Sequence, residues 1–401
     1  MSIKVIGKRW ILASIAAFCL TAFTCCGGDG AKENPDDGGE GQTGPDPKPV
    51  AVSFARGADI SWVSEMERDM KASGKSLSGF SFRDGQGNTD IFAILKGLGM
   101  NSVRLRGWVD PLDAARWSGK DDMVKLAKRA FDSGLAVMVD FHYSDFFADP
   151  SHQDTPSAWA SYSGDAVKMA DAVSSYTKEV LTALKSAGVA PTWVQTGNET
   201  RTGMLWPTGK LDWSASGRSA SWARFVQLVN AGYAAAKSVF PDVVVICHLN
   251  HAFADNAWWF EEFKAAGGKF DMIGLSHYPM ADDPSKSWSA MNSLAQSGVK
   301  TLSSKFSCKV MVVEYGVKPS DASAGECTKA FLSAMKSSSS ACAGVFYWEP
   351  EVDGTWKPAV YSSSVKKHGK AEEWNAYGMG AFKRSGKTLS PDLSILGAFA
   401  E

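Results

Sequence analysis

The chain has 401 residues, with 42 Lys and Arg against 43 Asp and Glu, so its formal charge is −1, and 44% of its residues are hydrophobic. The charge balance argues against a nucleic-acid binder, which needs a surplus of basic residues on one face, and the hydrophobic content excludes a disordered or fibrous protein. Fifteen Trp accompany 21 Phe and 9 Tyr, and flat rings lining a cleft suit sugar ligands.

Residues 1–25 predict a targeting segment. Three basic residues precede an apolar run, 10–23, of about 14 residues, which is too short to cross the roughly 30 Å core of a membrane. Because Cys25 and Cys26 follow this run, the segment resembles the signal of a bacterial lipoprotein, in which one such cysteine is acylated. We therefore expect an outer-membrane lipoprotein exposed on a Gram-negative cell and anchored through Cys25 or Cys26. A secreted or periplasmic protein is the alternative.

Residues 26–50 are rich in Gly, Pro and acidic residues. Because they have almost nothing to bury, we expect a flexible tether ahead of a catalytic domain over 51–401. Four cysteines fall in that domain, and no CxxC or HExxH spacing occurs, so no metal site is predicted.

From residue 54 onward, short apolar runs alternate with longer segments of helical period, which is the βα pattern of a parallel sheet. The predicted strands are 54–60, 102–108, 135–143, 192–199, 243–250, 272–278, 309–315 and 344–350, and the predicted helices include 121–133, 164–186, 218–240, 256–266, 288–303 and 326–338. Eight such units predict a single (β/α)8 TIM barrel with enlarged βα loops, in which the active site lies at the carboxyl ends of the strands.

Two carboxylates, Glu199 and Glu314, end the fourth and seventh predicted strands. Each charge would be costly to bury outside a cleft with partners. Retaining glycoside hydrolysis needs one protonated carboxyl and one ionised carboxylate about 5 to 5.5 Å apart, so these two are the predicted catalytic pair. Glu349 is the alternative nucleophile.

Polar and aromatic residues at the other strand ends are the candidate substrate-binding residues. We expect Asn198 to bind the sugar 2-hydroxyl, Tyr278 or His277 to hold the nucleophile, Arg104 or Arg106 to keep it ionised, and Trp348 to form a floor under the ring. The full set is Arg104, Arg106, His142, Asn198, Trp206, His277, Tyr278 and Trp348.

Other residues favour structural interpretations. His248 and His251 have a spacing that could bind metal, but with no third ligand nearby a hydrogen-bonding role is favoured. Trp258 and Trp259 are interpreted as mainly structural. No predicted strand carries a Lys near its end, which argues against a Schiff-base barrel.

These motifs resemble glycoside hydrolase family 53, the endo-β-1,4-galactanases that cut galactan side chains of pectin. The resemblance is carried by GADIS at 57–61, NSVRLR at 101–106, DFHYSD at 140–145, VQTGNE at 194–199, GMLWPTG at 203–209 and GVFYWEP at 344–350. It implies that Glu199 is the proton donor and Glu314 the nucleophile of a retaining clan A barrel that needs no cofactor.

The chain departs from the family pattern at Phe147, at Tyr315 and at Arg201 to Thr202, which leaves subsite preferences open. Some members of the family bind calcium after the seventh strand. Here the loop 316–325 has a single acid, too few oxygens for a six- to eight-ligand cage, so we predict no calcium there.

Cys308 and Cys342 precede the seventh and eighth predicted strands. Adjacent parallel strands lie about 4.8 Å apart, which is compatible with a disulfide, so this pair is the disulfide candidate, with Cys327 as a competing partner.

The expected function is hydrolysis of β-1,4-galactan by a monomeric, lipid-anchored enzyme that binds no nucleic acid. The alternatives are a retaining β-glycanase of the same clan acting on mannan or xylan, and a surface lipoprotein that captures glycans without cleaving them.

Overall fold

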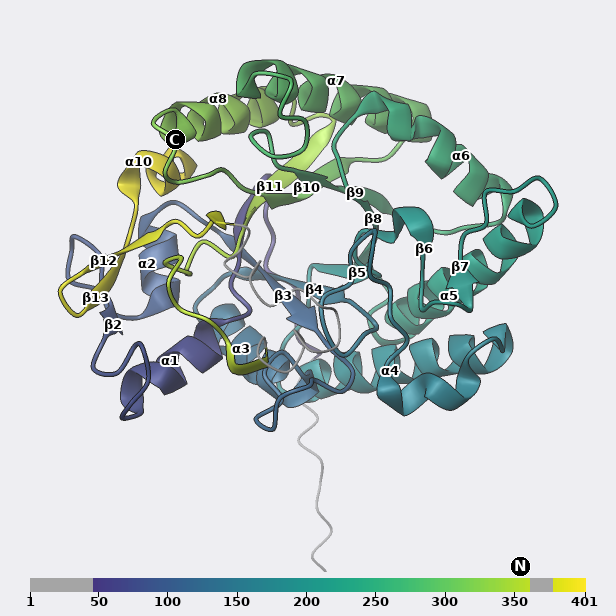
Figure 1. Ribbon diagram of the computed structural model, residues 1–401, viewed down its shortest axis with the longest axis horizontal. Helices are drawn as coiled ribbons and strands as arrows, with labels where there is room; N and C mark the ends of the chain where they lie inside the picture. The colour runs from purple at the N-terminus through teal and green to yellow at the C-terminus, as the bar shows by residue number, and fades with distance from the viewer. Residues whose placement is uncertain (1–45, 361–377) are drawn as a thin grey trace, which may run out of the picture. The chain divides into compact units, whose positions relative to one another are not determined.

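The computed structural model describes residues 46–360 and 378–401. Eight parallel strands form a closed barrel, and each strand pairs with the strands before and after it in chain order. Figure 1 shows this ring of strands inside a ring of helices. The barrel strands are β1 (Ala55–Asp59), β3 (Ser102–Gly107), β4 (Ala136–Phe141), β5 (Trp193–Thr196), β8 (Val244–Leu249), β9 (Met272–His277), β10 (Val310–Tyr315) and β11 (Cys342–Trp348).

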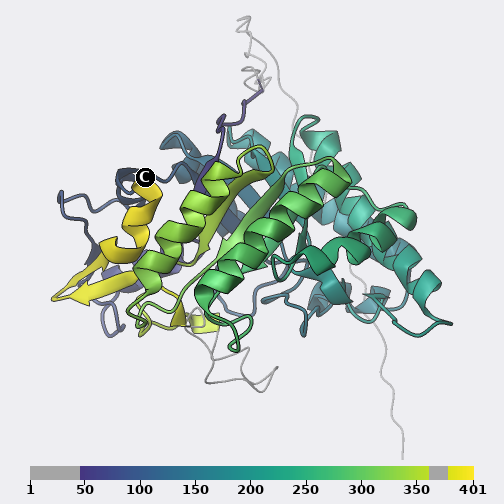
Figure 2. The same cartoon turned by 90° about the horizontal axis from the view of Figure 1, so that it is seen from above.

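All six predicted helices are present, so the predicted (β/α)8 barrel is confirmed. They are α3 (Lys120–Asp132), α4 (Ala166–Ser186), α5 (Arg218–Val239), α6 (Ala257–Ala265), α7 (Trp288–Phe306) and α8 (Ala324–Ser337). Figure 2 shows α7 and α8 side by side over β10 and β11.

The sequence did not predict several shorter elements. These are α1 (Val63–Lys71), α2 (Ile91–Gly97), α10 (Leu393–Leu396), a small sheet of β12 (Phe382–Ser385), β13 (Thr388–Pro391) and β2 (Ser81–Phe82), and a hairpin of β6 (Gly203–Met204) and β7 (Gly209–Lys210). Helix α2 begins at a conventional cap, since Asp90 accepts hydrogen bonds from the backbone N–H groups of Phe92 and Ala93.

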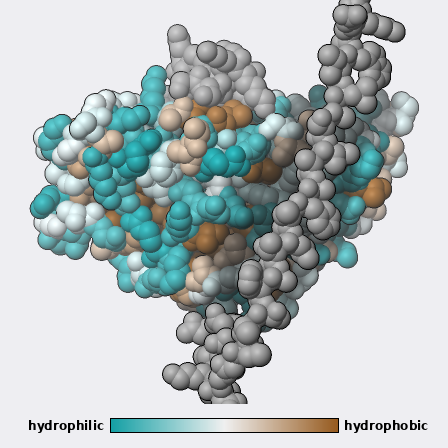
Figure 3. Space-filling model, turned by 90° about the horizontal axis from the view of Figure 1, so that it is seen from below, coloured by the Kyte–Doolittle hydropathy of each residue, from teal (hydrophilic) through white to brown (hydrophobic). Residues whose placement is uncertain are grey.

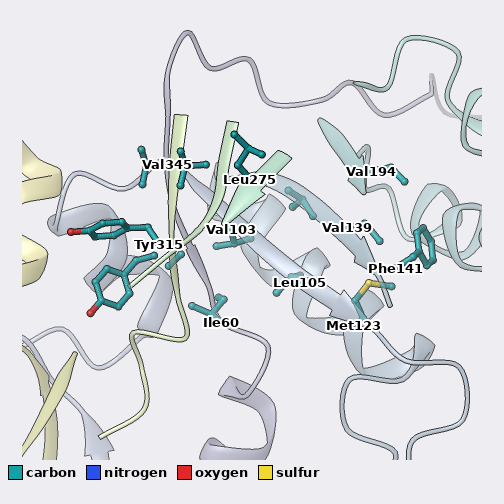
Figure 4. Packing of buried hydrophobic residues seen from close by; sticks show 14 of the residues in the cluster. Ile60, Val103, Leu105, Met123, Val139, Phe141, Val194, Leu275, Tyr315 and Val345 are labelled. Atoms are coloured by element: carbon teal, nitrogen blue, oxygen red, sulfur yellow. The ribbon is translucent and has the colours of Figure 1, made fainter. Parts of the chain in front are cut away.

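Alternation along the strands produces two separate cores. One set of side chains fills the barrel, and the other packs between the strands and the helices. The inner set is Ala55, Ala136, Met138, Trp193, Ile246, Met272, Met311, Val313, Ala343 and Phe346. The outer set includes Val103, Leu105, Val139 and Val194, which Figure 4 shows on the strands. Gly57 is required inside the barrel because a Cβ there would lie 2.2 Å from the Phe346 ring.

The same alternation turns polar side chains inward at the carboxyl ends of the strands. Asp140 and Gln195 lie two residues beyond Met138 and Trp193 of the inner set, and Arg104 of β3 contacts both of them. Residues of the same face lie two apart, so these groups converge at one end of the barrel. All three are buried, and this end therefore holds a polar cluster beneath the loops.

The last residues of the predicted tether contact the barrel. The Lys185 ammonium lies 2.7 Å from Asp46, and the Val50 carbonyl accepts a hydrogen bond from Thr192. Residues 46–50 are therefore part of the unit that runs from Asp46 to Glu401. The lipid-anchor prediction at Cys25 and Cys26, with the rest of the targeting segment and tether, lies outside the described residues.

Hydrophilic residues cover most of the face shown in Figure 3, with smaller hydrophobic areas between them. In the part of the chain that the structure describes, no helix is long and apolar enough to cross a membrane.

The predicted disulfide between Cys308 and Cys342 is wrong. Both are free thiols, as are Cys247 and Cys327. The partner of Cys342 across the strands is Val310, two residues beyond Cys308. Two residues add roughly 6.6 Å along the strand to the 4.8 Å between strands, which exceeds the spacing a disulfide allows.

Candidate active site

Local backbone distortions present both predicted catalytic glutamates. Strand β5 ends at Thr196, and the chain then turns through Gly197 (φ +97°) to Glu199 (φ +47°), where the short helix η2 (Thr200–Thr202) begins. Glu314 lies in β10, where the register with β9 shifts between Val312 and Glu314. Such a bulge re-aims a side chain. Strict alternation from the inward-facing Val313 would otherwise turn Glu314 outward.

Glu314 is 5% exposed and has two partners that favour its ionised form. Its Oε1 lies 2.9 Å from Arg104 Nη2, and its Oε2 accepts a hydrogen bond of 2.8 Å from the Tyr278 hydroxyl. Burial raises the pKa of Glu314, while Arg104 and Tyr278 oppose that rise. The two alternatives for these roles are thus resolved: Arg104 and Tyr278 contact this carboxylate.

Among the described residues, no cation lies within ion-pair distance of Glu199. Its Oε1 accepts a hydrogen bond of 2.6 Å from the Ser276 hydroxyl. Burial and the charge of Glu314 together raise the pKa of Glu199 well above its ordinary value, and the Ser276 hydrogen bond only moderates the rise. The two carboxyls therefore have opposite environments: Glu314 has a guanidinium and a phenol as partners, whereas Glu199 is shifted toward its protonated form.

His248 continues the hydrogen-bond chain behind Glu199. Its Nε2 lies 2.9 Å from Ser276 Oγ, and its Nδ1 accepts from the backbone N–H of Glu199 at 3.3 Å. Burial and the nearby Arg104 hold the pKa of His248 well below its ordinary value, so the ring is neutral. The Nε2–H can then donate to Ser276, whose own proton goes to Glu199. The prediction that His248 has a hydrogen-bonding role is confirmed.

Arg104 connects the two halves of the site. Besides Glu314 it contacts Asp59 at 2.9 Å, Asp140 at 2.8 Å and the Asn198 side-chain oxygen at 2.7 Å. Although burial acts to raise it, the pKa of Asp140 is lowered by Arg104 and by His142. One buried guanidinium therefore compensates three carboxylates and fixes the residue that precedes Glu199.

Arg106 pairs with a different carboxylate, Glu349. Its Nη1 is 2.5 Å from Glu349 Oε1, and its guanidinium lies over the rings of Trp62, Trp108 and Phe147 at 4.1 to 4.8 Å. Burial raises the pKa of Glu349 to about 7 despite this partner. Glu349 is fully buried, so it is a structural ion-pair residue and Glu314 remains the nucleophile candidate.

His142 and Asn198 are held by protein atoms. His142 Nε2 lies 2.9 Å from Asp140, and its Nδ1 accepts from the Ala148 backbone N–H. Asn198 donates to the Ala148 carbonyl through Nδ2 and accepts from Arg104 and Gln195 through Oδ1. The amide has one further N–H, which is the group available to a sugar hydroxyl.

The prediction that His277 binds substrate is wrong. Its ring is fully buried, its Nε2 lies 2.9 Å from Asn292 on α7, and it packs 4.6 Å from Phe331 on α8. Ser276 and Tyr278 face the barrel end, and adjacent strand residues face opposite sides. His277 therefore lies in the outer core, and burial lowers its pKa to about 4.

Two predicted aromatic residues lie near the polar cluster. Trp348 packs at 6.1 Å from the ring of Tyr278, whose hydroxyl donates to Glu314, and at 6.2 Å from Phe147. Trp206 is half-buried in the loop between β6 and β7, and Lys210 lies 4.3 Å from the centre of its ring.

Sequence reasoning missed Ser276, Asp59 and Gln195 as site residues. Gln195 donates hydrogen bonds to Asp140 and to Asn198. Ser276, Asp59 and Gln195 all lie near strand ends at positions that face the barrel interior, and this was a signal that the sequence offered. A lone Ser or Gln on a strand, however, has no distinctive chemistry. Within residues 46–360 and 378–401, no group of three His, Cys, Asp or Glu could hold a metal ion. The expectation of no calcium after β10 stays a prediction.

Comparisons with known proteins agree with this geometry. Residues 55–395 match the description "Glycosyl hydrolase family 53". An arabinogalactan endo-β-1,4-galactanase of Thermothelomyces thermophilus is 32% identical over 74% of this chain and 89% of its own length, and an endo-β-1,4-galactanase of Bacillus subtilis is 29% identical over 82% and 75%. An uncharacterized protein of Niallia circulans is 37% identical, but this chain spans only 59% of it.

Solved structures point the same way. The GH53 catalytic domain of Ignisphaera aggregans has a TM-score of 0.68 at 26% identity and covers 88% of this chain and 98% of that domain. A fungal β-1,4-galactanase has a TM-score of 0.67 at 28% identity, with 87% and 99% covered. With a family match over most of its length and a barrel whose carboxyl end holds Glu199 and Glu314, the chain belongs to glycosyl hydrolase family 53 and is a glycosidase.

Proposed function

We propose that the protein is an endo-acting β-1,4-galactanase that hydrolyses the galactan side chains of pectin with retention at the anomeric carbon. The observation that carries this proposal is the opposite environment of the two carboxyls. Arg104 and Tyr278 support the charge of Glu314, while burial and the charge of Glu314 favour the proton on Glu199. The substrate is supported by the relatives named as galactanases.

In the first step, Glu314 attacks the anomeric carbon while Glu199 gives its proton to the leaving oxygen. The carbon–oxygen glycosidic bond breaks as the bond to Glu314 forms. Glu314 then no longer carries a charge, so the pKa of Glu199 falls and Glu199 stays ionised after giving up its proton, in the form that acts as a base. In the second step, Glu199 takes a proton from water, whose oxygen attacks the same carbon and releases Glu314.

The surrounding residues prepare both steps. Arg104 and Tyr278 orient the Glu314 carboxylate, and Arg104 also fixes Asn198 next to Glu199. The remaining amide proton of Asn198 can donate to the sugar 2-hydroxyl, a contact that strengthens in the transition state. Trp348 supplies an apolar ring beside Tyr278, suited to the face of a pyranose.

The test is the product profile of the wild type, Glu314→Ala and Glu199→Ala on linear β-1,4-galactan, with galactomannan and xylan alongside. We expect short galacto-oligosaccharides from the wild type only, a β-anomeric first product by NMR, and losses of several orders of magnitude in both variants. Cleavage of mannan or xylan instead would keep the mechanism and reject the substrate. Binding without cleavage would favour a glycan-capturing protein.

We also propose that the enzyme is a lipoprotein exposed on the outer membrane, on the strength of the apolar run that ends at Cys25 and Cys26. Mass spectrometry of the mature N-terminus should show an acylated cysteine, and protease treatment of intact cells should remove the activity. An unmodified N-terminus in the culture medium would contradict the anchor.

A further inference from the structure

Two tryptophans outside the catalytic cluster are exposed and touch each other. In the described ranges, Trp213 is 42% exposed and Trp258 is 40% exposed, and their ring centres lie 5.7 Å apart at 73°. Both Trp258 and Trp259 were expected to be mainly structural; Trp259 is fully buried, whereas much of Trp258 is exposed. Neither Trp213 nor Trp258 has a part in the chemistry described above.

The pair is fixed to the catalytic loop through buried rings. Trp213 packs on Trp222 at 6.3 Å, and Trp222 packs on Trp259 at 5.1 Å. Trp259 Nε1 donates a hydrogen bond of 3.0 Å to the carbonyl of Arg201, two residues after Glu199. Rings held in this way lose little conformational freedom when a ligand binds, which favours affinity.

The pair lies on the face of the barrel that carries the active site. Trp213 precedes α5, and Trp258 is in the first turn of α6. In a barrel of alternating strands and helices, each helix begins at the end where the preceding strand finishes, which is also the catalytic end. The loop with Trp206 leads from Glu199 to Trp213 along the chain.

The cation beside both rings is paired with a carboxylate. Arg218 lies 5.5 Å and 5.9 Å from the centres of the two rings and forms two hydrogen bonds to Glu262, of 3.1 Å and 2.9 Å. Rings beside a neutralised ion pair match a neutral ligand with apolar C–H faces and many hydroxyls better than they match an anion.

The exposed area is too small for a stable protein partner. At roughly 250 Å² for a tryptophan, the two rings expose about 200 Å² together, whereas a specific protein interface buries about 800 Å² on each side. A sugar chain needs only one or two rings per contact.

We propose that Trp213 and Trp258 form a secondary binding site for a β-1,4-galactan chain, outside the catalytic cluster and on the same face. This deepens the proposed function and rests on it. The site holds polymeric substrate near the active site, so it affects long chains and leaves the reaction of a short oligosaccharide unchanged.

The first experiment measures binding. In a Glu314→Ala background, affinity electrophoresis in gels with linear galactan is compared for the parent protein, Trp213→Ala/Trp258→Ala and Leu294→Ala. Leu294 is a matched control because it is 41% exposed on α7. We expect the double tryptophan variant to bind galactan at least five-fold more weakly and the Leu294 variant to bind as the parent does.

The second experiment measures turnover in the presence of Glu314. For the Trp213→Ala/Trp258→Ala enzyme we expect KM on polymeric galactan to rise at least five-fold, with kcat/KM on a galactotetraoside within two-fold of the wild type. The short substrate also reports folding, and the conservative pair Trp213→Phe/Trp258→Phe, which keeps flat rings, should restore most of the polymer affinity.

Three outcomes would overturn the secondary site. The first is an affinity for polymeric galactan that is unchanged in the double variant, and the second is an equal loss of kcat/KM on short and long substrates. The third is a dimer that sedimentation detects in the wild type and not in the variant, which would make the pair a protein interface. The proposed function fails separately, if the wild type leaves galactan intact.

Discussion

Removing the hydroxyl group that donates a hydrogen bond to each candidate catalytic carboxyl should move one limb of the pH profile, a different limb for each carboxyl. Ser276 donates to Glu199, and Tyr278 donates to Glu314. A donor stabilises the ionised carboxylate, so its loss raises the pKa of its partner. In the proposed double displacement, Glu314 must be ionised and Glu199 protonated, so we expect the acid limb of kcat/KM to report mainly Glu314 and the alkaline limb mainly Glu199.

The size of each shift follows from the two hydrogen bonds. A hydrogen bond to a charged group contributes about 1.5 to 3 kcal/mol, and 1.36 kcal/mol corresponds to one pKa unit, so each limb should move by about one to two units. Water can replace the donor more easily at the half-buried Glu199 than at the buried Glu314. The Ser276→Ala shift should therefore lie nearer one unit.

The assay is kcat/KM on a soluble galacto-oligosaccharide from pH 3 to 10 for the wild type, Ser276→Ala and Tyr278→Phe. We expect Ser276→Ala to move the alkaline limb to higher pH and Tyr278→Phe to move the acid limb to higher pH. Ser276→Thr keeps the hydroxyl and should restore the wild-type profile, which separates the loss of the hydrogen bond from a change in packing.

An alkaline limb that stays in place or moves to lower pH in Ser276→Ala would refute the reasoning, because the hydroxyl would then not be stabilising the Glu199 carboxylate. Equal movement of both limbs in both variants would show that the two carboxyls titrate as one unit and that neither hydroxyl acts on its own partner.

Three further predictions concern stability. Arg104→Met should lower the free energy of unfolding by about 3 to 5 kcal/mol in urea titrations, because three buried carboxylates lose their cation; a loss below 1 kcal/mol would contradict this. Burial raises the pKa of Glu65 from 4.5 to about 7, so the folded protein holds a proton that the unfolded chain releases. The contribution of Glu65 should thus fall as pH rises from 4.5 to 7, by about 3 kcal/mol at most, and Glu65→Gln should flatten that decline. Alkylation of denatured, unreduced protein should label both Cys308 and Cys342, and Cys308→Ala should not cause the loss of about 2 to 4 kcal/mol expected on removing a disulfide.

The order of elements was readable from the sequence, because buried parallel strands and amphipathic crossover helices each have a local pattern. Boundaries were less certain where the backbone departs from regular geometry. The predicted strand 192–199 ends at Thr196, because Gly197 and Glu199 adopt positive φ values. Short elements such as β2 and α2 are set by tertiary contacts and had too little pattern to predict.

The candidate catalytic pair was also readable, since two acids at the ends of the fourth and seventh strands, beside Asn198 and Tyr278, form a chemically specific set. The partners of that pair were not. Both Arg104 and Arg106 face the same end of the barrel, and only the packing assigns the first to Glu314 and the second to Glu349.

Local sequence therefore determined the barrel, its order of strands and the identity of its two acids, because those depend on residue type and period. The tertiary structure decided the rest. A shift of one residue in the register between β9 and β10 turns Glu314 inward. Cys342 pairs with Val310, two residues beyond Cys308, and this offset keeps the two cysteines apart. Alternation along β9 directs Ser276 toward Glu199 and His277 into the outer core. These outcomes depend on which strands lie side by side and in what register, and no local window of sequence contains that information.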